Sequence, residues 1–184
     1  IVSTDSKKYL EIAKSLGAQC PFKRPSTISG DLIQDYDVIS HALSEMESSK
    51  NTVYDFIVLL RPTSPLRPDG LIERGVNLLL DNEDATSARA MTKCSQHPYR
   101  NWKLSDDGSV KSFVNIYEPY NMPRQVLPVS FFQTGDIEVI KRATIKNGSV
   151  SGNKILPIII DNDSYLDIDN LIDFEKALKL INEK

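Results

Sequence analysis

Residues 56–70 read FIVLLRPTSPLRPDG, and this stretch decides the fold prediction. The run Phe56–Leu60 is continuously apolar and rich in β-branched residues, which is typical of a central strand covered on both faces. The proline-rich residues 61–68 cannot continue regular structure. Apolar residues at helical spacing follow, at Leu71, Ile72, Val76, Leu79 and Leu80. We therefore predict a strand, a loop and a helix, which is one βα unit of a parallel sheet.

The same order recurs along the chain. Ile1-Val2 resembles a strand end, and the next apolar pattern predicts a helix capped by Asp5 or Ser6 and ended by Gly17. A longer helix is predicted after Asp31. Further predicted elements are strands at 85–92, 137–140 and 155–160, a hairpin turn at 106–108, and a closing helix at 171–181 with Phe174, Leu178 and Ile181 facing inward. This order predicts an α/β fold, a Rossmann-like three-layer sandwich with a mostly parallel sheet.

Chain length and composition limit the domain count and the class of protein. The 184 residues fit a single domain, 1–184. Residues 101–134 hold the only tryptophan and several prolines and interrupt the alternation, so we expect an extended insertion that covers a site or a partner. Cys20 and Cys94 show no metal-ligand spacing and are expected to be reduced structural thiols.

Charge and hydropathy argue against several partners. The net charge is −3, and no stripe of lysine and arginine suited to a phosphodiester backbone occurs, so nucleic acid is not an expected partner. The longest apolar runs are far too short to span a membrane. Because no charged and apolar leader opens the chain, we predict a cytoplasmic protein.

The triplet Asp167-Ile168-Asp169 is the sharpest candidate for metal chemistry. Alternate residues of an extended segment project to the same face, so the two carboxylates could share one hard cation such as Mg²⁺. An alternative is that Asp169 caps the helix that starts near residue 171. Nearby Asp161, Asp163 and Asp173 add negative charge that favours a cation.

The loop Arg61-Pro-Thr-Ser-Pro-Leu-Arg67 directly follows the predicted strand, where α/β sheets bind their ligands. Its two guanidinium groups and two hydroxyls suit phosphate or carboxylate oxygens, although a solvated proline-rich turn is the alternative. The motifs GxGxxG, GxxxxGK[ST], HExxH and GxSxG are absent from the sequence. Dinucleotide oxidoreductases, P-loop ATPases, zincins and α/β-hydrolases therefore lack their signatures here.

Taken together, these motifs resemble the acylneuraminate cytidylyltransferases, also called CMP-sialic acid synthetases, which have the nucleotide-diphospho-sugar transferase fold. The resemblance extends from Ile1 to the C-terminal helix. It is carried by Val2-Ser3-Thr4-Asp5-Ser6, Arg24-Pro25 with Ser29-Gly30-Asp31, Leu59 to Arg67, Pro123-Arg124-Gln125 with Leu127-Pro128, the strand around Gly135, and Asp167-Ile168-Asp169. The order and spacing of these motifs make the signal specific.

The resemblance implies a cytidylyltransferase that joins CMP from CTP to an acidic 2-keto-3-deoxy sugar, with release of pyrophosphate. It implies that Asp167 and Asp169 hold Mg²⁺ and are catalytic, and that Asp5, Arg24 and Asp31 bind the nucleotide. The residues that it assigns to the sugar are Arg61, Thr63, Ser64, Arg124, Gln125 and Phe131. It also implies that residues 101–134 form a homodimer and close over the sugar.

Several departures from the family pattern change these expectations. The phosphate-cradling glycine-rich loop is absent, so we expect a further βα unit of about 30 residues in the natural protein and weak CTP binding by this chain alone. Arg61 stands where many members have glutamine, and Gln133 to Glu138 adds two acids. We therefore expect a sugar other than plain N-acetylneuraminate, such as a legionaminic-type acid.

Two alternative functions remain at this stage. A GT-A type glycosyltransferase also uses an Asp-x-Asp metal site, but its motif usually lies mid-chain, whereas Asp167-Ile168-Asp169 precedes the last predicted helix. A non-enzymatic alternative is an inactive dimeric fragment that binds a sugar nucleotide.

Overall fold

A computed structural model describes residues 1–161 and 165–182. The chain divides into two compact units. Unit 1 comprises Ile1–Leu59, Ile72–Ala88 and Glu138–Leu156, and unit 2 comprises Leu60–Leu71, Arg89–Ile137 and Pro157–Lys184. The single domain expected from the chain length stays a prediction. No helix among the described residues is long and apolar enough to cross a membrane.

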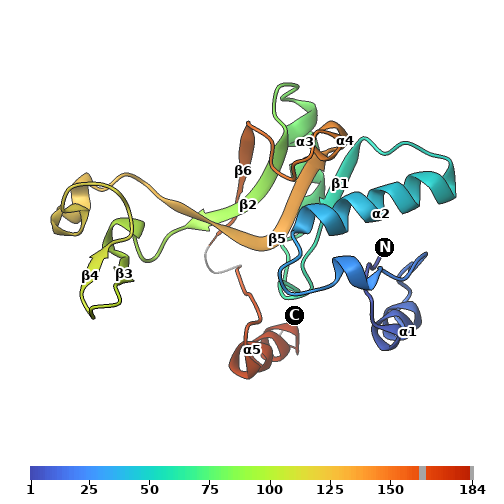
Figure 1. Cartoon of the computed structure of the whole chain (residues 1–184), viewed down its shortest axis with the longest axis horizontal. Helices are drawn as coiled ribbons and strands as arrows, with labels where there is room; N and C mark the ends of the chain where they lie inside the picture. Colours follow the sequence, from blue (N-terminus) through green and yellow to red (C-terminus); the bar gives the residue numbers. More distant parts are fainter. Residues whose placement is uncertain (162–164, 183–184) are drawn as a thin grey trace. The chain divides into compact units, whose positions relative to one another are not determined.

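The main sheet has four strands in the order β1-β5-β2-β6, which can be followed in Figure 1. Their bounds are β1 Phe56–Leu59, β5 Phe131–Lys141, β2 Ser87–Lys93 and β6 Ile155–Ile159. β1 and β5 are antiparallel. Hydrogen bonds from Lys141 N to Thr86 O and from Cys94 N to Ser130 O show that β5 is also antiparallel to β2.

β6 lies parallel to β2. The backbone N–H of Thr86 donates to Lys154 O, and further along the pair the N–H of Ile160 donates to Met91 O. Hence β1, β2 and β6 run in one direction and β5 runs in the opposite direction. The predicted α/β fold with a mostly parallel sheet is confirmed, with β5 as its antiparallel member.

The predicted central position of β1 is wrong. β1 is the end strand of the sheet among the described residues, and all four of its residues are only half-buried. A continuous apolar run indicates a strand with little polar surface, but it does not indicate how many strands flank it. In this chain β5 and β2 take the central positions.

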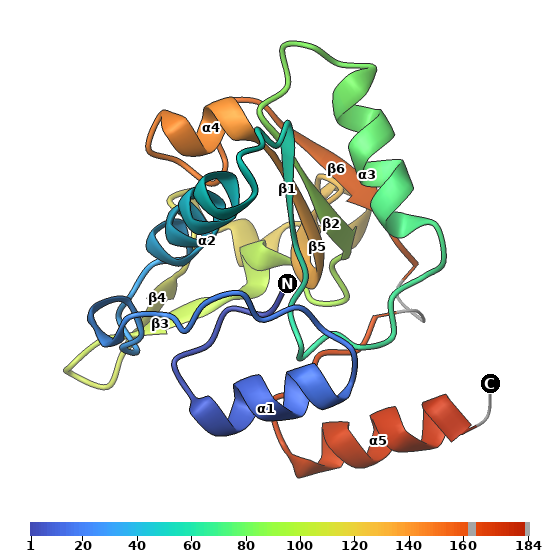
Figure 2. The ribbon, with the colours of Figure 1, turned by 90° about the vertical axis from the view of Figure 1, so that its right-hand side faces the viewer.

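In unit 1, helices cover both faces of the sheet. Figure 2 shows α2 (Asp35–Lys50) and α4 (Arg142–Lys146) on one side, with α3 (Leu71–Leu80) on the other. The core between the sheet and the first pair contains Ile39, Leu43, Ile140 and Ile145, all buried. Asn51 ends α2 in the left-handed conformation, with φ 47° and ψ 47°. These helices give the three layers that the sequence predicted.

The strand end predicted at Ile1-Val2 does not form. Residues 1–5 carry no strand and are joined to residues 18–24 by bonds from Val2 N to Gln19 O and from Arg24 N to Thr4 O. These isolated bonds do not build a ladder. The helix that follows, α1 (Lys7–Ser15), is confirmed, with Ser6 as its N-cap and Gly17 at φ 87° beyond its end.

Unit 2 contains the predicted hairpin, in which β3 (Trp102–Leu104) pairs antiparallel with β4 (Val110–Ser112). The Trp102 ring packs on Tyr120 with 4.3 Å between the ring centroids. The described residues also form short 3₁₀ helices: η1 Ser26–Ile28 in unit 1, and η2 Pro98–Arg100, η3 Pro119–Asn121 and η4 Arg124–Val126 in unit 2.

The last helix, α5 (Leu171–Asn182), forms as predicted, but its predicted inward face is wrong. Phe174, Leu178 and Ile181 each remain nearly half exposed, whereas Ala177 is buried. The period of the apolar residues predicted the helix correctly. It could not show how closely the helix packs on the rest of unit 2.

Candidate functional site

A main-chain hydrogen bond joins the acidic triplet to the proline-rich turn within unit 2. The N–H of Ile168 donates to the carbonyl oxygen of Thr63 over 2.8 Å. The turn itself is closed by a bond of 3.1 Å from Ser64 N to Arg61 O. The segment that carries Asp167 and Asp169 therefore lies directly beside the turn that carries the predicted sugar-binding residues.

Arg67 ties this turn to strand β5. Its Nε donates to the carbonyl oxygen of Asp136 over 2.5 Å, and its terminal Nη2 donates to the carbonyl oxygen of Arg61. The side chain is half-buried. Burial lowers the pKa of Arg67, whereas the charge of Asp136 raises it. The guanidinium thus fixes the beginning of the turn against β5 by donating to two main-chain oxygens.

Gly135 allows β5 to approach the turn closely. A Cβ at this position would overlap the hydroxyl of Ser64 and lie 3.4 Å from Cδ of Arg61. Ser64 is fully buried, so its hydroxyl cannot move into solvent to make room. A residue without a side chain is therefore required where β5 passes beneath the turn.

Several polar atoms near this contact are buried without a hydrogen-bond partner among the described residues. They are the hydroxyl oxygens of Ser64 and Thr134, both carboxylate oxygens of Asp136, and Oδ1 of Asp167. Native proteins leave few such atoms, because each costs free energy unless a ligand or an ordered water satisfies it. Their concentration beside the turn identifies this part of unit 2 as the candidate site.

The electrostatics of Asp136 reflect this burial. Its side chain is 1% exposed, and burial raises the pKa of its carboxyl group. The charge of Asp167 raises that pKa further, while Thr134 and Arg67 lower it. Thr134 is near enough to act on the carboxylate, yet its hydroxyl does not meet the oxygens at hydrogen-bonding geometry. The buried carboxylate therefore lacks full compensation.

Tyr165 lies in the same group of residues. Its ring packs against Phe132 in a T-shaped arrangement with 5.3 Å between the centroids. Burial raises the pKa of its hydroxyl, and the charges of Asp167, Asp169 and Asp136 raise it further. Tyr165 thus lies close enough to all three carboxylates for their charges to act on its hydroxyl.

The residues present fit a divalent cation held by two carboxylates. Asp167 offers a buried oxygen without a partner. Asn170, rather than Asp169, caps α5: its Oδ1 accepts from Ile172 N over 2.9 Å and from Asp173 N over 3.1 Å. The alternative role considered for Asp169 is therefore taken by Asn170. Paired carboxylates suit Mg²⁺, which keeps several waters and is bound by few protein ligands.

A larger all-protein metal cluster is not found. Among residues 1–161 and 165–182, no group of three or more His, Cys, Asp or Glu side chains could hold a metal ion. Asp161 is exposed and Asp173 accepts a bond from Asp169 N, while Asp163 lies outside the described residues. The fit of a cation thus depends on Asp167 and Asp169.

The remaining predicted sugar residues lie in other parts of unit 2. Arg124 and Gln125 are exposed on η4, and Phe131 begins β5 with its ring partly exposed. Figure 1 shows the η3–η4 segment beside the β3–β4 hairpin. Thr63 is exposed and Arg61 half-buried in the turn. The structure thus places Thr63 and Asp167 together, and it places Arg124 and Gln125 on a separate segment.

The predicted nucleotide residues lie in unit 1. A terminal nitrogen of Arg24 is 3.9 Å from a carboxylate oxygen of Asp5, and Nε of Arg24 donates to the Ser29 hydroxyl over 3.0 Å. Asp31 is exposed shortly after this contact. The structure therefore brings Asp5 and Arg24 together through the segment that contains η1.

Sequence reasoning did not identify the buried roles of Arg67, Gly135 and Tyr165. Arg67 could not be distinguished from a surface arginine, because its partners are main-chain oxygens. The available signal was the sequence Thr134-Gly135-Asp136, where a glycine and an acid stand in the middle of a predicted strand. Such an interruption indicates a close backbone approach and a buried charge.

Comparison with known proteins finds similar cytidylyltransferases. The chain is 33% identical over 186 residues to N-acylneuraminate cytidylyltransferase of Escherichia coli O18:K1:H7, covering all of this chain and 42% of that protein. It is 22% identical to pseudaminic acid cytidylyltransferase and 26% identical to CMP-N,N′-diacetyllegionaminic acid synthase, both of Campylobacter jejuni, covering 79% and 77% of those proteins. The chain is thus similar in sequence to cytidylyltransferases that act on acylneuraminate, pseudaminic acid and diacetyllegionaminic acid. It spans less than half of the length of the Escherichia coli relative.

Solved structures share the fold of this chain. CMP:2-keto-3-deoxy-manno-octonic acid synthetase complexed with CTP matches with a TM-score of 0.66 over 99% of this chain and 80% of the other, at 13% identity. A 4-diphosphocytidyl-2C-methyl-D-erythritol synthase from Anaerococcus prevotii matches with a TM-score of 0.54 over 96% and 78%, at 14% identity. No protein-family model matches the chain.

Proposed function

We propose that this chain is part of a CTP-dependent cytidylyltransferase that joins CMP to an acidic 2-keto-3-deoxy sugar, a sialic or other nonulosonic acid, and releases pyrophosphate. The observation that carries the proposal is the bond from Ile168 N to Thr63 O, because it holds two carboxylates beside a turn of hydroxyl and guanidinium groups. The named activities of the relatives support the same reaction.

Asp167 and Asp169 are the residues that would hold Mg²⁺. When bound, the ion supplies charge compensation for the α-phosphate and the departing pyrophosphate. The protein's part is to orient its two carboxylates. The main chain of Ile168, fixed to Thr63, positions Asp167 and Asp169 on either side of that bond. Both carboxylates remain available to a cation, because the N-terminus of α5 is capped by Asn170.

The substrate roles divide between the two units. In unit 1, Asp5, Arg24 and Asp31 contact the nucleotide, with Arg24 oriented by Asp5 and Ser29. In unit 2, the residues that form the sugar site are Arg61, Thr63, Ser64, Arg124, Gln125 and Phe131. Ser64 is buried, so it contributes to that site by shaping the turn.

The sugar is proposed to differ from plain N-acetylneuraminate. The guanidinium group of Arg61 presents several hydrogen-bond donors in place of a neutral amide, which favours an acceptor with an additional polar substituent. Two Campylobacter jejuni relatives are named for pseudaminic acid and for diacetyllegionaminic acid, which supports a wider sugar class. A panel of nonulosonic acids assayed with the full-length protein tests this, and a clear preference for N-acetylneuraminate would contradict it.

The chain is further proposed to form a cytoplasmic homodimer through residues 101–134. This segment exposes apolar side chains that a second copy would cover, including Phe113, Tyr117, Val126 and Val129. Size-exclusion chromatography with light scattering checks the oligomeric state. A monomer at micromolar concentration would remove this part of the proposal.

The reaction is tested by incubating the full-length protein with CTP, Mg²⁺ and the sugar panel. Pyrophosphate release and a CMP-sugar product identified by mass spectrometry are expected. The Asp167→Asn and Asp169→Asn variants should each lose activity by about 100-fold or more, because a metal ligand is lost. Transfer of a sugar from a nucleotide sugar, without pyrophosphate, would instead indicate a glycosyltransferase.

A further inference from the structure

We propose that Asp136 is a positioning residue whose buried negative charge strengthens divalent-cation binding at Asp167 and Asp169, an inference that rests on the proposed function. The nearby Thr134 hydroxyl and both Asp136 carboxylate oxygens lack hydrogen-bond partners among the described residues. Asp136 is 1% exposed, so water does not solvate the carboxylate from outside.

A buried carboxylate without partners is costly to a folded protein. Burying a charge is unfavourable unless a counter-charge or hydrogen bonds compensate it. Asp136 therefore destabilises the cation-free protein in its charged form. A divalent cation bound nearby would compensate this negative charge, which explains why a carboxylate is buried here.

Arg67 does not supply that compensation. Its Nε donates to the main-chain oxygen of Asp136, and its Nη2 donates to the main-chain oxygen of Arg61. Both bonds are thus directed to backbone carbonyls, and burial outweighs the guanidinium in setting the pKa of Asp136. In these two bonds Arg67 fixes the turn and does not donate to the carboxylate oxygens of Asp136.

The position of Asp136 links it to the proposed ligands. Gly135, the neighbour of Asp136, packs against Ser64, and Ile168 bonds to Thr63, so one turn holds Asp136 close to the segment of Asp167 and Asp169. No three His, Cys, Asp or Glu side chains among the described residues form a metal-holding group, so Asp136 is proposed as a nearby charge and not as a third ligand. Its negative charge attracts the cation toward Asp167 and Asp169, as charged outer-shell carboxylates strengthen other metal sites.

The test is the Asp136→Asn variant of the full-length protein, a change that removes the charge and keeps the shape. In EDTA, this variant should unfold about 2–4 °C higher than the wild type, because an uncompensated charge is gone. Titration calorimetry with MgCl₂ alone should show cation binding weakened by about 10-fold or more. Asp106→Asn removes the same charge from the exposed hairpin turn and should change neither quantity.

Each outcome decides the inference. Higher stability in EDTA together with weaker Mg²⁺ binding supports it. An Asp136→Asn protein that is unfolded or less stable in EDTA shows that the carboxylate serves the structure through Arg67, and overturns it. Unchanged Mg²⁺ affinity also overturns it while leaving the proposed function intact. If the wild type binds no Mg²⁺ at millimolar concentration, both this inference and the proposed metal site fail.

Discussion

A methyl group on Gly135 would overlap the hydroxyl of Ser64. Strand β5 and the turn at 61–64 are therefore too close together for any side chain at position 135. The Gly135→Ala variant should therefore be less stable by about 1–3 kcal/mol, because one of the two segments must shift. Chemical denaturation measures this difference. Gly30→Ala is the matched control, since a Cβ there meets only a side-chain atom at 4.0 Å. Equal stability of the two variants would contradict the close approach.

Removal of the Arg67 guanidinium should loosen the turn from β5. Arg67→Met keeps the apolar stem but leaves the carbonyl oxygens of Arg61 and Asp136 without their donors. We expect a loss of about 2 kcal/mol or more in the free energy of unfolding, since buried acceptors left unsatisfied cost about 1–3 kcal/mol each. The exposed Arg100 provides the control Arg100→Met, for which denaturation should show little change.

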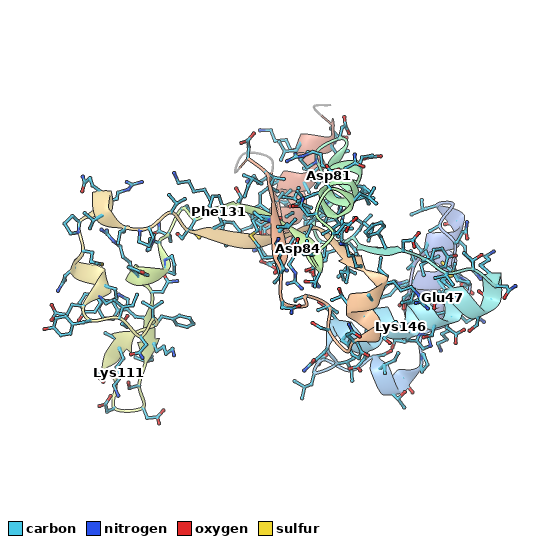
Figure 3. The ribbon with its side chains drawn as sticks, turned by 90° about the horizontal axis from the view of Figure 1, so that it is seen from above. Glu47, Asp81, Asp84, Lys111, Phe131 and Lys146 are labelled. Atoms are coloured by element: carbon cyan, nitrogen blue, oxygen red, sulfur yellow. The ribbon has the colours of Figure 1, made fainter. Side chains whose placement is uncertain are left out.

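Acid stability should depend on Glu47. Its carboxylate accepts from Arg142 Nε over 2.5 Å and lies 3.5 Å from Lys146 Nζ, and Figure 3 shows Glu47 and Lys146 on α2 and α4. The hydrogen bond from Arg142 is the main cause that lowers the pKa of Glu47 from 4.5 to about 2. Because the folded pKa is depressed, the stabilisation is present above pH 4.5 and is lost as the pH falls through about 2.

The Glu47→Gln variant tests this sign. Its free energy of unfolding should be lower than that of the wild type at neutral pH, and the difference should shrink as the pH is lowered from 4.5 toward 2. Glu11→Gln, on the exposed surface of α1, is the control. Urea denaturation at a series of pH values makes the comparison. A difference that grows toward acid pH would contradict the assignment.

A cavity in the core of unit 1 should lower the free energy of unfolding strongly. Ile145 on α4 is buried beside Ile140, Ile39 and Leu43. Ile145→Ala is expected to cost about 2–5 kcal/mol, the usual range for a large-to-small change in a packed core. Ile12→Ala on α1 removes the same atoms from a largely exposed position and should cost much less. Differential scanning calorimetry gives both values.

The sequence predicted those features that depend on local pattern. The α1 helix with its Ser6 cap, the turn before β4 and the βα order all follow from spacing and from turn residues, and all are present. The position of β1 at the end of the sheet could not be predicted, because strand order depends on pairings between distant segments. The exposure of Phe174 likewise depends on packing and not on period.

The same limit applies to the candidate site. Asp167, Asp169 and the turn at 61–67 could be proposed because residue types and spacing indicate their chemistry. The bond from Ile168 N to Thr63 O could not, since it joins main-chain atoms from segments more than a hundred residues apart. The same holds for the burial of Asp136, which results from contacts of β5 with the turn.

The link between the acidic triplet and the turn uses only peptide groups. Substitutions at Thr63 or at Ile168 change the chemistry presented to a ligand without removing the donor or the acceptor of that link, proline at 168 excepted. Selectivity for different sugars could therefore diverge through side-chain exchange during evolution, while the frame that holds the two carboxylates is inherited unchanged.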